Sequence, residues 1–236
     1  MNVIVPPTAA RHRMRLDRSA TRWQAANLYR NPFGELERAE RAELAVVDVD
    51  RILRQIGSQS ATRDWQFRSR AAFQLLGDCG RGKTTRMLAI GRVIPQAAYV
   101  YLPEDAACPT IPWGWPLLVD EAQRLPRRIR RLVFDSGVPL VLSSHRDLTG
   151  PLRRAGYDVH TDRIGLTLTA EKLTEILNRR VLASLRSPAT DVPQITLTDA
   201  ARLIERFGTD VRSIEGYLYD VVQQQVETDG ELRFID

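Results

Sequence analysis

The residues from Gly77 to Thr85 have the types and the spacing of a phosphate-binding loop. The stretch GDCGRGKTT fits the pattern G-x-x-x-x-G-K-[ST], in which glycine-rich backbone lets successive N–H groups surround phosphate oxygens. In this interpretation the Lys83 ammonium neutralises the β- and γ-phosphates, and the Thr84 hydroxyl ligates Mg²⁺. We therefore expect ATP and Mg²⁺ at a loop formed by Gly77, Asp78, Cys79, Gly80, Arg81, Gly82, Lys83, Thr84 and Thr85.

The alternative is an ordinary glycine-rich turn before a helix. Of the 34 basic residues only Lys83 and Lys172 are lysines, and one of the two stands where the motif requires it. The apolar run 71–76 (AAFQLL) predicts a buried strand before the loop, and 84–94 predicts a helix after it. Strand, loop and helix are the setting in which this motif binds phosphate.

Two carboxylates follow a second apolar strand. The run PLLVDEAQ, residues 116–123, places Asp120 and Glu121 at the end of that strand. We expect Asp120 to hold Mg²⁺, directly or through water, and Glu121 to polarise the attacking water. The alternative is a helix start, where acidic residues favour the helix dipole.

A third apolar strand, VPLVLSS, ends in polar residues. Ser143, Ser144 and His145 stand at its tip, and a parallel sheet would bring this tip beside the phosphate loop. Ser144 is the expected contact to the γ-phosphate, with Ser143 and His145 as open alternatives. The three residues could also simply begin a turn.

The whole chain predicts an α/β fold. Apolar runs alternate with amphipathic stretches up to residue 168, which indicates a mainly parallel sheet covered by helices on both faces. From residue 169 the spacing of apolar residues is helical throughout, which predicts a small all-helical domain. The expected organisation is a basic arm at 1–30, a core at 31–168 and the helical domain at 169–236.

The net charge of +5 lies in the first 30 residues. Six arginines there stand against Asp17, and His12, Trp23 and Tyr29 are interleaved with them. Such an arm could bind DNA phosphates and stack on bases, or it could be a disordered or partner-docking tail. Without a long apolar run or a secretory signal, we expect a soluble, cytoplasmic protein. Cys79 and Cys108 are expected to be free thiols.

These residues together resemble the AAA+ ATPase family of P-loop NTPases, over about 31–225. The matching features are the phosphate loop, the Asp-Glu strand, a polar first sensor and a helical lid. Within the lid, GTDVRSIEGYLYD resembles a second-sensor motif, by which Arg212 would reach the nucleotide. Arg212 could instead be a solvated flank of a core-facing helix. The segment Asn31, Pro32 and Phe33 resembles one that packs near adenine in several AAA+ groups.

The resemblance also implies a homo-oligomer, a ring or a filament, in which an arginine of one subunit completes the site of its neighbour. Arg153 and Arg154 stand where this finger usually falls, and Arg163 is the reserve candidate; adjacent surface arginines can also be plain solvated charge. The short, proline-rich connection between Lys83 and Asp120 argues against threading of polypeptide through a ring.

A second basic cluster follows the Asp-Glu strand on a predicted helix, and it comprises Arg124, Arg127, Arg128, Arg130 and Arg131. It could line a nucleic-acid path or a subunit interface, or be a solvated helix face. The function predicted from the sequence is an Mg-ATP-dependent oligomeric switch on DNA, of the initiator or transposition-regulator type. The alternatives are an ATP-gated protein-interaction ATPase without nucleic acid, serving secretion or signalling, and a small-substrate kinase. The helical lid and its Arg212 motif count against the kinase.

Overall fold

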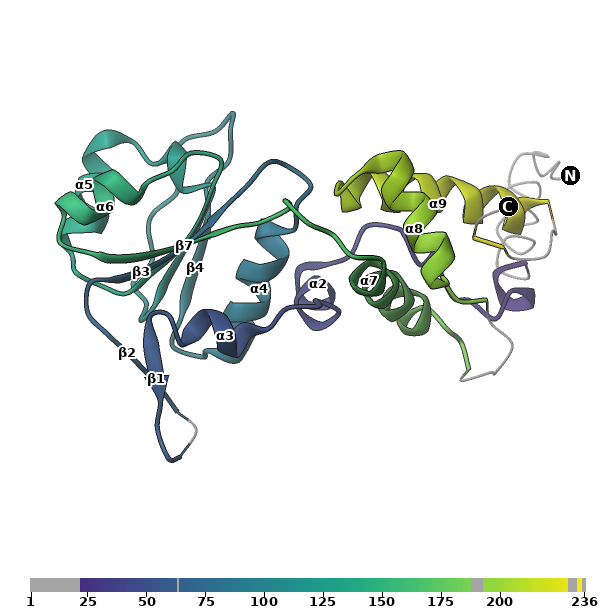
Figure 1. Ribbon diagram of the computed structural model, residues 1–236, viewed down its shortest axis with the longest axis horizontal. Helices are drawn as coiled ribbons and strands as arrows, with labels where there is room; N and C mark the ends of the chain where they lie inside the picture. Colours follow the sequence, from purple (N-terminus) through teal and green to yellow (C-terminus); the bar gives the residue numbers. More distant parts are fainter. Residues whose placement is uncertain (1–21, 63, 188–192, 229–232, 235–236) are drawn as a thin grey trace, which may run out of the picture. The chain divides into compact units, whose positions relative to one another are not determined.

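The chain divides into two compact units, each described here by itself (Figure 1). The computed structural model describes residues 22–62, 64–187, 193–228 and 233–234. One unit, the sheet unit, comprises residues 36–168 and 209–211; the other, the helical unit, comprises residues 22–35, 169–208 and 212–234 where described. Most of the predicted basic arm, residues 1–21, lies outside the described residues. Residues 31–35, which the sequence assigns to the core, group by their contacts with the helical unit.

The sheet unit is built on five parallel strands in the order β4-β5-β6-β3-β7. The strands are β3 (Ala71–Leu76), β4 (Ala98–Tyr101), β5 (Leu117–Asp120), β6 (Leu140–Ser144) and β7 (Asp158–Arg163). Every residue of β3, β5 and β6 is buried. A strand buried on both faces needs a continuous apolar run, which is why these three strands are readable in the sequence.

Helices cover both faces of this sheet, and the predicted α/β fold is confirmed in this respect (Figure 1). On one face, α3 (Val49–Leu53) and α4 (Lys83–Val93) pack on the side chains of Phe73, Leu75 and Val141. On the other face, α5 (Arg127–Asp135) and α6 (Thr149–Arg154) pack on Ala72, Leu140 and Leu142. The alternation of β-strand side chains between faces sends neighbouring residues of one strand into different layers.

Three smaller elements complete the sheet unit. A short hairpin pairs β1 (Gly57–Gln59) with β2 (Trp65–Phe67), and the two β2 aromatic rings stack at 6.2 Å between centroids. Helix α2 (Arg38–Glu43) precedes α3, and the 3₁₀ helix η1 (Ala122–Arg124) follows β5. The hairpin is a difference from the sequence prediction, which has no strand before residue 71.

The helical unit contains α7 (Ala170–Ala183), α8 (Leu197–Phe207) and the residues of α9 (Val211–Glu227) from 212 onward. Thr169 and Thr196 cap α7 and α8 through their hydroxyls, and α8 ends at Gly208, which has a φ of 63°. Buried apolar residues of each helix form the core, among them Leu177 on α7, Leu203 on α8 and Leu218 on α9. Within the described part of the chain, no helix combines the length and the apolar character that crossing a membrane requires.

Candidate nucleotide-binding site

The predicted phosphate loop lies between the carboxyl end of β3 and the first turn of α4. Gly80 and Gly82 have φ angles of 76° and 79°, a conformation that only glycine adopts readily. A side chain at either position would therefore strain the loop. The backbone of the loop thus favours glycine at both positions, and the predicted contact of the loop with phosphate stays a prediction. Thr84 and Thr85 follow in the first turn of α4, both partly exposed.

The Lys83 side chain is folded onto its own loop. Its Nζ donates to the carbonyl oxygens of Gly77 at 2.7 Å and Asp78 at 2.8 Å, and it lies 3.3 Å from His145 Nε2. Only 5% of Lys83 is exposed. Burial lowers the pKa of the ammonium, against the opposing attraction of Glu121 and other nearby acidic groups. The positive charge of Lys83 is thus unfavourable in this buried position, and an anion bound in the loop would stabilise it.

Asp120 is completely buried and is held by hydroxyl groups on both carboxylate oxygens. Tyr99 from β4 donates to Oδ2 at 2.9 Å, and Ser143 from β6 donates to Oδ1. Burial and the negative charge of Asp120 raise the pKa of Tyr99, so that its hydroxyl remains a donor. Two hydroxyl donors hold the carboxylate in a fixed orientation, which suits a metal ligand or an acceptor for metal-bound water.

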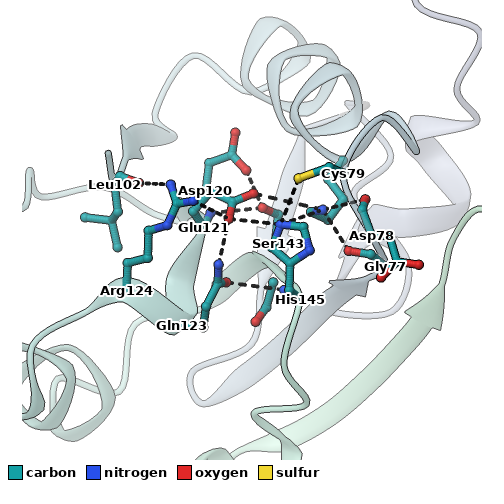
Figure 2. Close-up of polar contacts among 12 residues, drawn as sticks. Gly77, Asp78, Cys79, Leu102, Asp120, Glu121, Gln123, Arg124, Ser143 and His145 are labelled. Atoms are coloured by element: carbon teal, nitrogen blue, oxygen red, sulfur yellow. Dashed lines mark hydrogen bonds and ion pairs between the residues drawn. The ribbon is translucent and has the colours of Figure 1, made fainter. Parts of the chain in front are cut away.

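Glu121 stands at the centre of a polar cluster at the carboxyl edge of the sheet (Figure 2). Its carboxylate accepts a hydrogen bond from Gln123 at 2.6 Å and lies 3.2 Å from His145 Nε2. The Lys83 ammonium is 4.0 Å from Oε1, and the Arg124 guanidinium is 3.7 Å from Oε2. The backbone of Glu121 has a φ of 63°, which is unusual for a residue with a side chain. Such strain is most often retained where a side chain must point in a particular direction.

The three candidate sensor residues have different surroundings. Ser143 bonds to Asp120 and accepts from the backbone N–H of Glu121 at 3.0 Å. The Ser144 hydroxyl is turned into the following bend, where it donates to the Arg146 carbonyl at 2.6 Å. His145 instead points toward Glu121 and lies 3.7 Å from the sulfur of Cys79 (Figure 2). The residue that joins the loop and the acidic strand is thus His145, whereas Ser144 stabilises the turn.

The order of the strands explains this convergence. Because β6 lies between β3 and β5, the end of β6 enters the space between the phosphate loop and the acidic residues. Carboxyl ends of parallel strands are where such sheets bind ligands. Lys83, Glu121 and His145 come from three separate segments and lie within contact distance of one another.

A segment far along the chain also packs on the loop. Arg81 donates through NH1 to the Thr209 hydroxyl, which itself donates to the Gly165 carbonyl at 2.7 Å. The carboxylate of Asp210 lies against Gly80, where a Cβ would be 2.3 Å from its Oδ1. Arg212, the predicted second sensor, follows this segment directly in α9. Its predicted contact with nucleotide stays a prediction.

Asn31, Pro32 and Phe33 are buried within the helical unit. The Asn31 amide donates to the Tyr219 carbonyl at 3.0 Å and its oxygen accepts from the backbone of Phe33. The ring of Phe33 packs edge-on against Phe234 at 5.7 Å. These contacts give the segment a structural role that its sequence does not reveal, and its predicted proximity to adenine stays a prediction.

A buried arginine that the sequence does not single out holds this segment in place. Arg180 of α7 is 6% exposed and donates to the carbonyl oxygens of Pro32 at 2.9 Å and of Gly34. Its third contact is an ion pair with Glu215 of α9. A buried charge of this kind requires such complete pairing.

The candidate finger residues lie at two different edges of the sheet. Arg153 and Arg154 are exposed at the end of α6, which leads to the amino end of β7. The six residues of β3 separate that edge from the phosphate loop by about 20 Å. Arg163 lies at the carboxyl end of β7, opposite Leu76 and next to the loop, where it is 3.9 Å from Asp147. Arg153 and Arg154 therefore could serve only the site of another subunit.

The cluster predicted as one basic helix is divided, which corrects the prediction. Arg124 belongs to η1, donates to the Leu102 carbonyl at 3.0 Å and pairs with Glu104 at 2.9 Å. Leu125 and Pro126 end that turn, and α5 begins at Arg127. Proline at 126 disfavours a helical conformation for the residue before it, and Leu125 has a ψ of 122°. Arg124 is thus part of the site, and the other four arginines lie on α5.

Two further polar residues support the site and were missed from the sequence. Gln74 is fully buried in β3 and accepts from the backbone of Leu148 at 2.7 Å, while its amide donates to Asp147 and Thr161 at 3.1 Å. It thereby holds the bend that carries His145. Arg86 in α4 donates to the carbonyl of Gly82 at 3.2 Å, and burial lowers its pKa. The sequence does contain one indication of the role of Gln74, because it is a polar residue inside the otherwise apolar strand β3.

The residues present fit a nucleotide phosphate group and Mg²⁺. The loop offers positive-φ glycines, a buried ammonium and the amino end of an eleven-residue helix, the combination that binds phosphate. Thr84 and Asp120 supply oxygen ligands of the kind Mg²⁺ prefers, and it usually takes its other ligands from phosphates and water.

Comparisons with known proteins do not assign the chain to a family. A scan against protein-family models finds no match for the chain, and a search of curated proteins finds no matching sequence.

Proposed function

We propose that this chain is an Mg²⁺-dependent ATP hydrolase of the AAA+ type, acting as an oligomeric switch on DNA. The observation that carries the proposal is the meeting of Lys83, Glu121 and His145 at the carboxyl edge of the sheet, with Lys83 Nζ 4.0 Å from Glu121 Oε1. A phosphate-neutralising ammonium and a candidate base thus lie side by side at the end of the phosphate loop. A γ-phosphate bound by Lys83 would bring its attacking water close to Glu121.

Binding of ATP exchanges the partners of Lys83. The ammonium leaves the carbonyl oxygens of Gly77 and Asp78 for phosphate oxygens, while backbone N–H groups between Gly80 and Lys83 surround the phosphates. Arg86 keeps the turn in shape through the Gly82 carbonyl. Because the loop is already folded, little of the binding energy is spent on ordering it.

Hydrolysis requires a group that takes a proton from water. Glu121 performs this step, oriented by Gln123 and held close to Lys83 and Arg124. His145 contacts the same carboxylate from the end of β6, and from there it would sense the γ-phosphate. Mg²⁺ held by Thr84 and Asp120 would neutralise the negative charge that develops on the transferred phosphoryl group.

In this proposal, hydrolysis depends on assembly of the subunits. Arg153 and Arg154 are exposed at the edge of the sheet opposite the loop. Either arginine could therefore complete only the nucleotide site of a neighbouring subunit. We propose that ATP assembles subunits on DNA and that hydrolysis releases them.

The test is phosphate release measured across protein concentrations, with and without MgCl₂ and DNA. The proposal expects Mg²⁺-dependent turnover whose rate per subunit rises with protein concentration, because the finger is supplied by a neighbour. A rate per subunit that does not depend on protein concentration would contradict the proposed role of the oligomer in hydrolysis. Absence of ATP hydrolysis under every condition would contradict the proposed enzymatic activity. ATP binding without hydrolysis would favour an ATP-gated binding protein.

A further inference from the structure

The solvent-facing side of α5 is strongly basic. Arg127, Arg128 and Arg131 are exposed on this face, and Arg130 is partly exposed at its border. Val133 and Phe134 on the opposite side are buried in the hydrophobic core beneath the sheet. The apolar anchor fixes the rotation of the helix, so the arginines cannot turn away from solvent.

The position of these charges opposes the helix dipole. All four arginines lie within the first five residues of α5, and its first turn carries no acidic residue. Cations near the amino end of a helix are unfavourable, since that end already carries partial positive charge. Among the described residues, Arg131 alone of the four has an ion pair, with Asp135 at 3.5 Å. The arrangement is electrostatically costly in the isolated chain, and a bound polyanion would relieve it.

The chemistry of the face favours nucleic acid over an acidic protein. The only large apolar side chain exposed on α5 is Leu132, whereas protein interfaces usually contain aromatic and apolar residues at their centre. Arginine forks fit phosphate oxygens with two hydrogen bonds, and phosphate contacts account for most of the affinity in DNA binding without sequence preference.

A short, hydrogen-bonded path joins α5 to Glu121. The backbone N–H of Arg124 donates to the Glu121 carbonyl at 2.9 Å, and that of Leu125 donates to Ala122 at 3.2 Å. Arg130 then donates to the Pro126 carbonyl at 2.8 Å within the first turn of α5. Ala122 and Leu125 are buried, so this path is packed along its length. Arg124 itself lies 3.7 Å from the Glu121 carboxylate.

We propose that α5 binds the phosphate backbone of DNA and that this contact raises the rate of ATP hydrolysis through η1 and Arg124. The inference rests on the proposed ATPase function and assigns its DNA contact and its regulation to particular residues. Arg127, Arg128 and Arg131 make the contact, and Arg124 transmits it to Glu121 as a positioning residue.

The first experiment measures DNA affinity in the full chain. The triple variant R127Q/R128Q/R131Q is compared with R51Q/R54Q/R92Q, which removes the same charge from exposed arginines on the opposite face of the sheet. Binding of a fluorescein-labelled duplex of random sequence is followed by anisotropy across salt concentrations. The α5 variant is expected to bind at least tenfold more weakly, with a slope of log affinity against log salt shallower by about 2.7, or 0.9 for each lost contact.

The control variant should keep the slope of the wild type. An unchanged slope in the α5 variant, or an equal loss in both variants, would overturn the proposal. Both triple variants alter exposed side chains only, and a cooperative thermal transition in each confirms folding. The control loses the exposed ion pair of Arg92 with Glu43 at 3.8 Å, which contributes at most about 1 kcal/mol. For α5, loss of cations near the helix amino end should raise the melting temperature.

The second experiment measures ATP hydrolysis with and without the same duplex. In the α5 variant the basal rate should equal that of the wild type, and stimulation by DNA should be lost. R124Q should keep the DNA affinity and salt slope of the wild type but lose stimulation, which separates positioning of Glu121 from DNA contact. Full stimulation in R124Q would overturn the transmitting role, and stimulation by polyglutamate but not by duplex would overturn DNA as the partner.

These outcomes separate the inference from the proposed function. If the wild type neither binds nor hydrolyses ATP, the proposed enzyme fails first. If the wild type hydrolyses ATP and responds to DNA while the α5 variant behaves identically, only the inference fails.

Discussion

Replacing Glu121 by glutamine removes the proposed general base and keeps the shape of the side chain. Glu121 is 8% exposed and its carboxylate lies close to Gln123, His145 and Arg124, so an isosteric amide disturbs the packing little. An amide cannot accept a proton from water at neutral pH. We expect kcat to fall while nucleotide binding persists.

The size of the fall follows from the role. General-base catalysis contributes about 10²- to 10⁴-fold, which at about 1.36 kcal/mol for each tenfold corresponds to about 3–5 kcal/mol of activation free energy. Affinity for ATP should stay equal or improve. The negative charge of Glu121 that now faces Lys83 at 4.0 Å, and that would face the γ-phosphate, is removed.

The assay is steady-state phosphate release together with calorimetric titration of ATP, and E104Q is the matched control. Glu104 pairs with the same arginine, Arg124, at 2.9 Å, but its side chain is 75% exposed. An exposed ion pair contributes about 0–1 kcal/mol, so E104Q should retain kcat within about twofold to fivefold of the wild type. Wild-type turnover in E121Q would refute the base assignment. An equal fall in E121Q and E104Q would show that both act through Arg124.

Three further outcomes test the loop and the assembly. G80A should destabilise the chain by at least about 1–2 kcal/mol because its φ is 76° and a Cβ would meet Asp210, whereas G216A, in open space on α9, should stabilise it by about 0.5–1 kcal/mol in urea unfolding. Burial lowers the pKa of Lys83 from its ordinary value of 10.5. As the pH rises, the ammonium is therefore lost, and ATP affinity should begin to decrease, before pH 10.5 is reached. Over the same window the unfolded state binds the proton more tightly, so the nucleotide-free protein should gain stability as pH rises, and K83A should lack this gain. R153A or R154A should bind ATP normally but hydrolyse it slowly, and mixing with K83A subunits should restore part of the activity; no recovery on mixing would count against a finger in trans.

The sheet was readable from the sequence because its central strands are buried on both faces. The strand at 71–76 was predicted with its observed bounds, since AAFQLL is a continuous apolar run. The hairpin of β1 and β2 was missed because each strand has three residues, and the residues of β1 are polar or glycine. Such short strands form only where tertiary contacts, here the packing of Trp65 and Phe67, support them.

The site was predicted as a set of strand ends, but its internal geometry was not. Ser143, Ser144 and His145 are consecutive, and the bend after β6 decides which of them faces Glu121. That bend depends on Gln74, a residue about 70 positions earlier in the chain. The role of Asn31 likewise depends on Tyr219, a distant contact that no local pattern contains. The division between Arg124 and α5, by contrast, was available from Pro126.

The most direct test of the central claim is the affinity for ATP of K83A and K172A. Lys83 and Lys172 are the only lysines of the chain, and Lys172 lies in the first turn of α7, in the other unit. Calorimetric titration with Mg-ATP should give binding by the wild type and by K172A, and none by K83A in a chain that circular dichroism shows to be folded. If folded K83A binds ATP with the affinity of the wild type, the loop from Gly77 to Thr85 is not a nucleotide site and the proposed function is wrong.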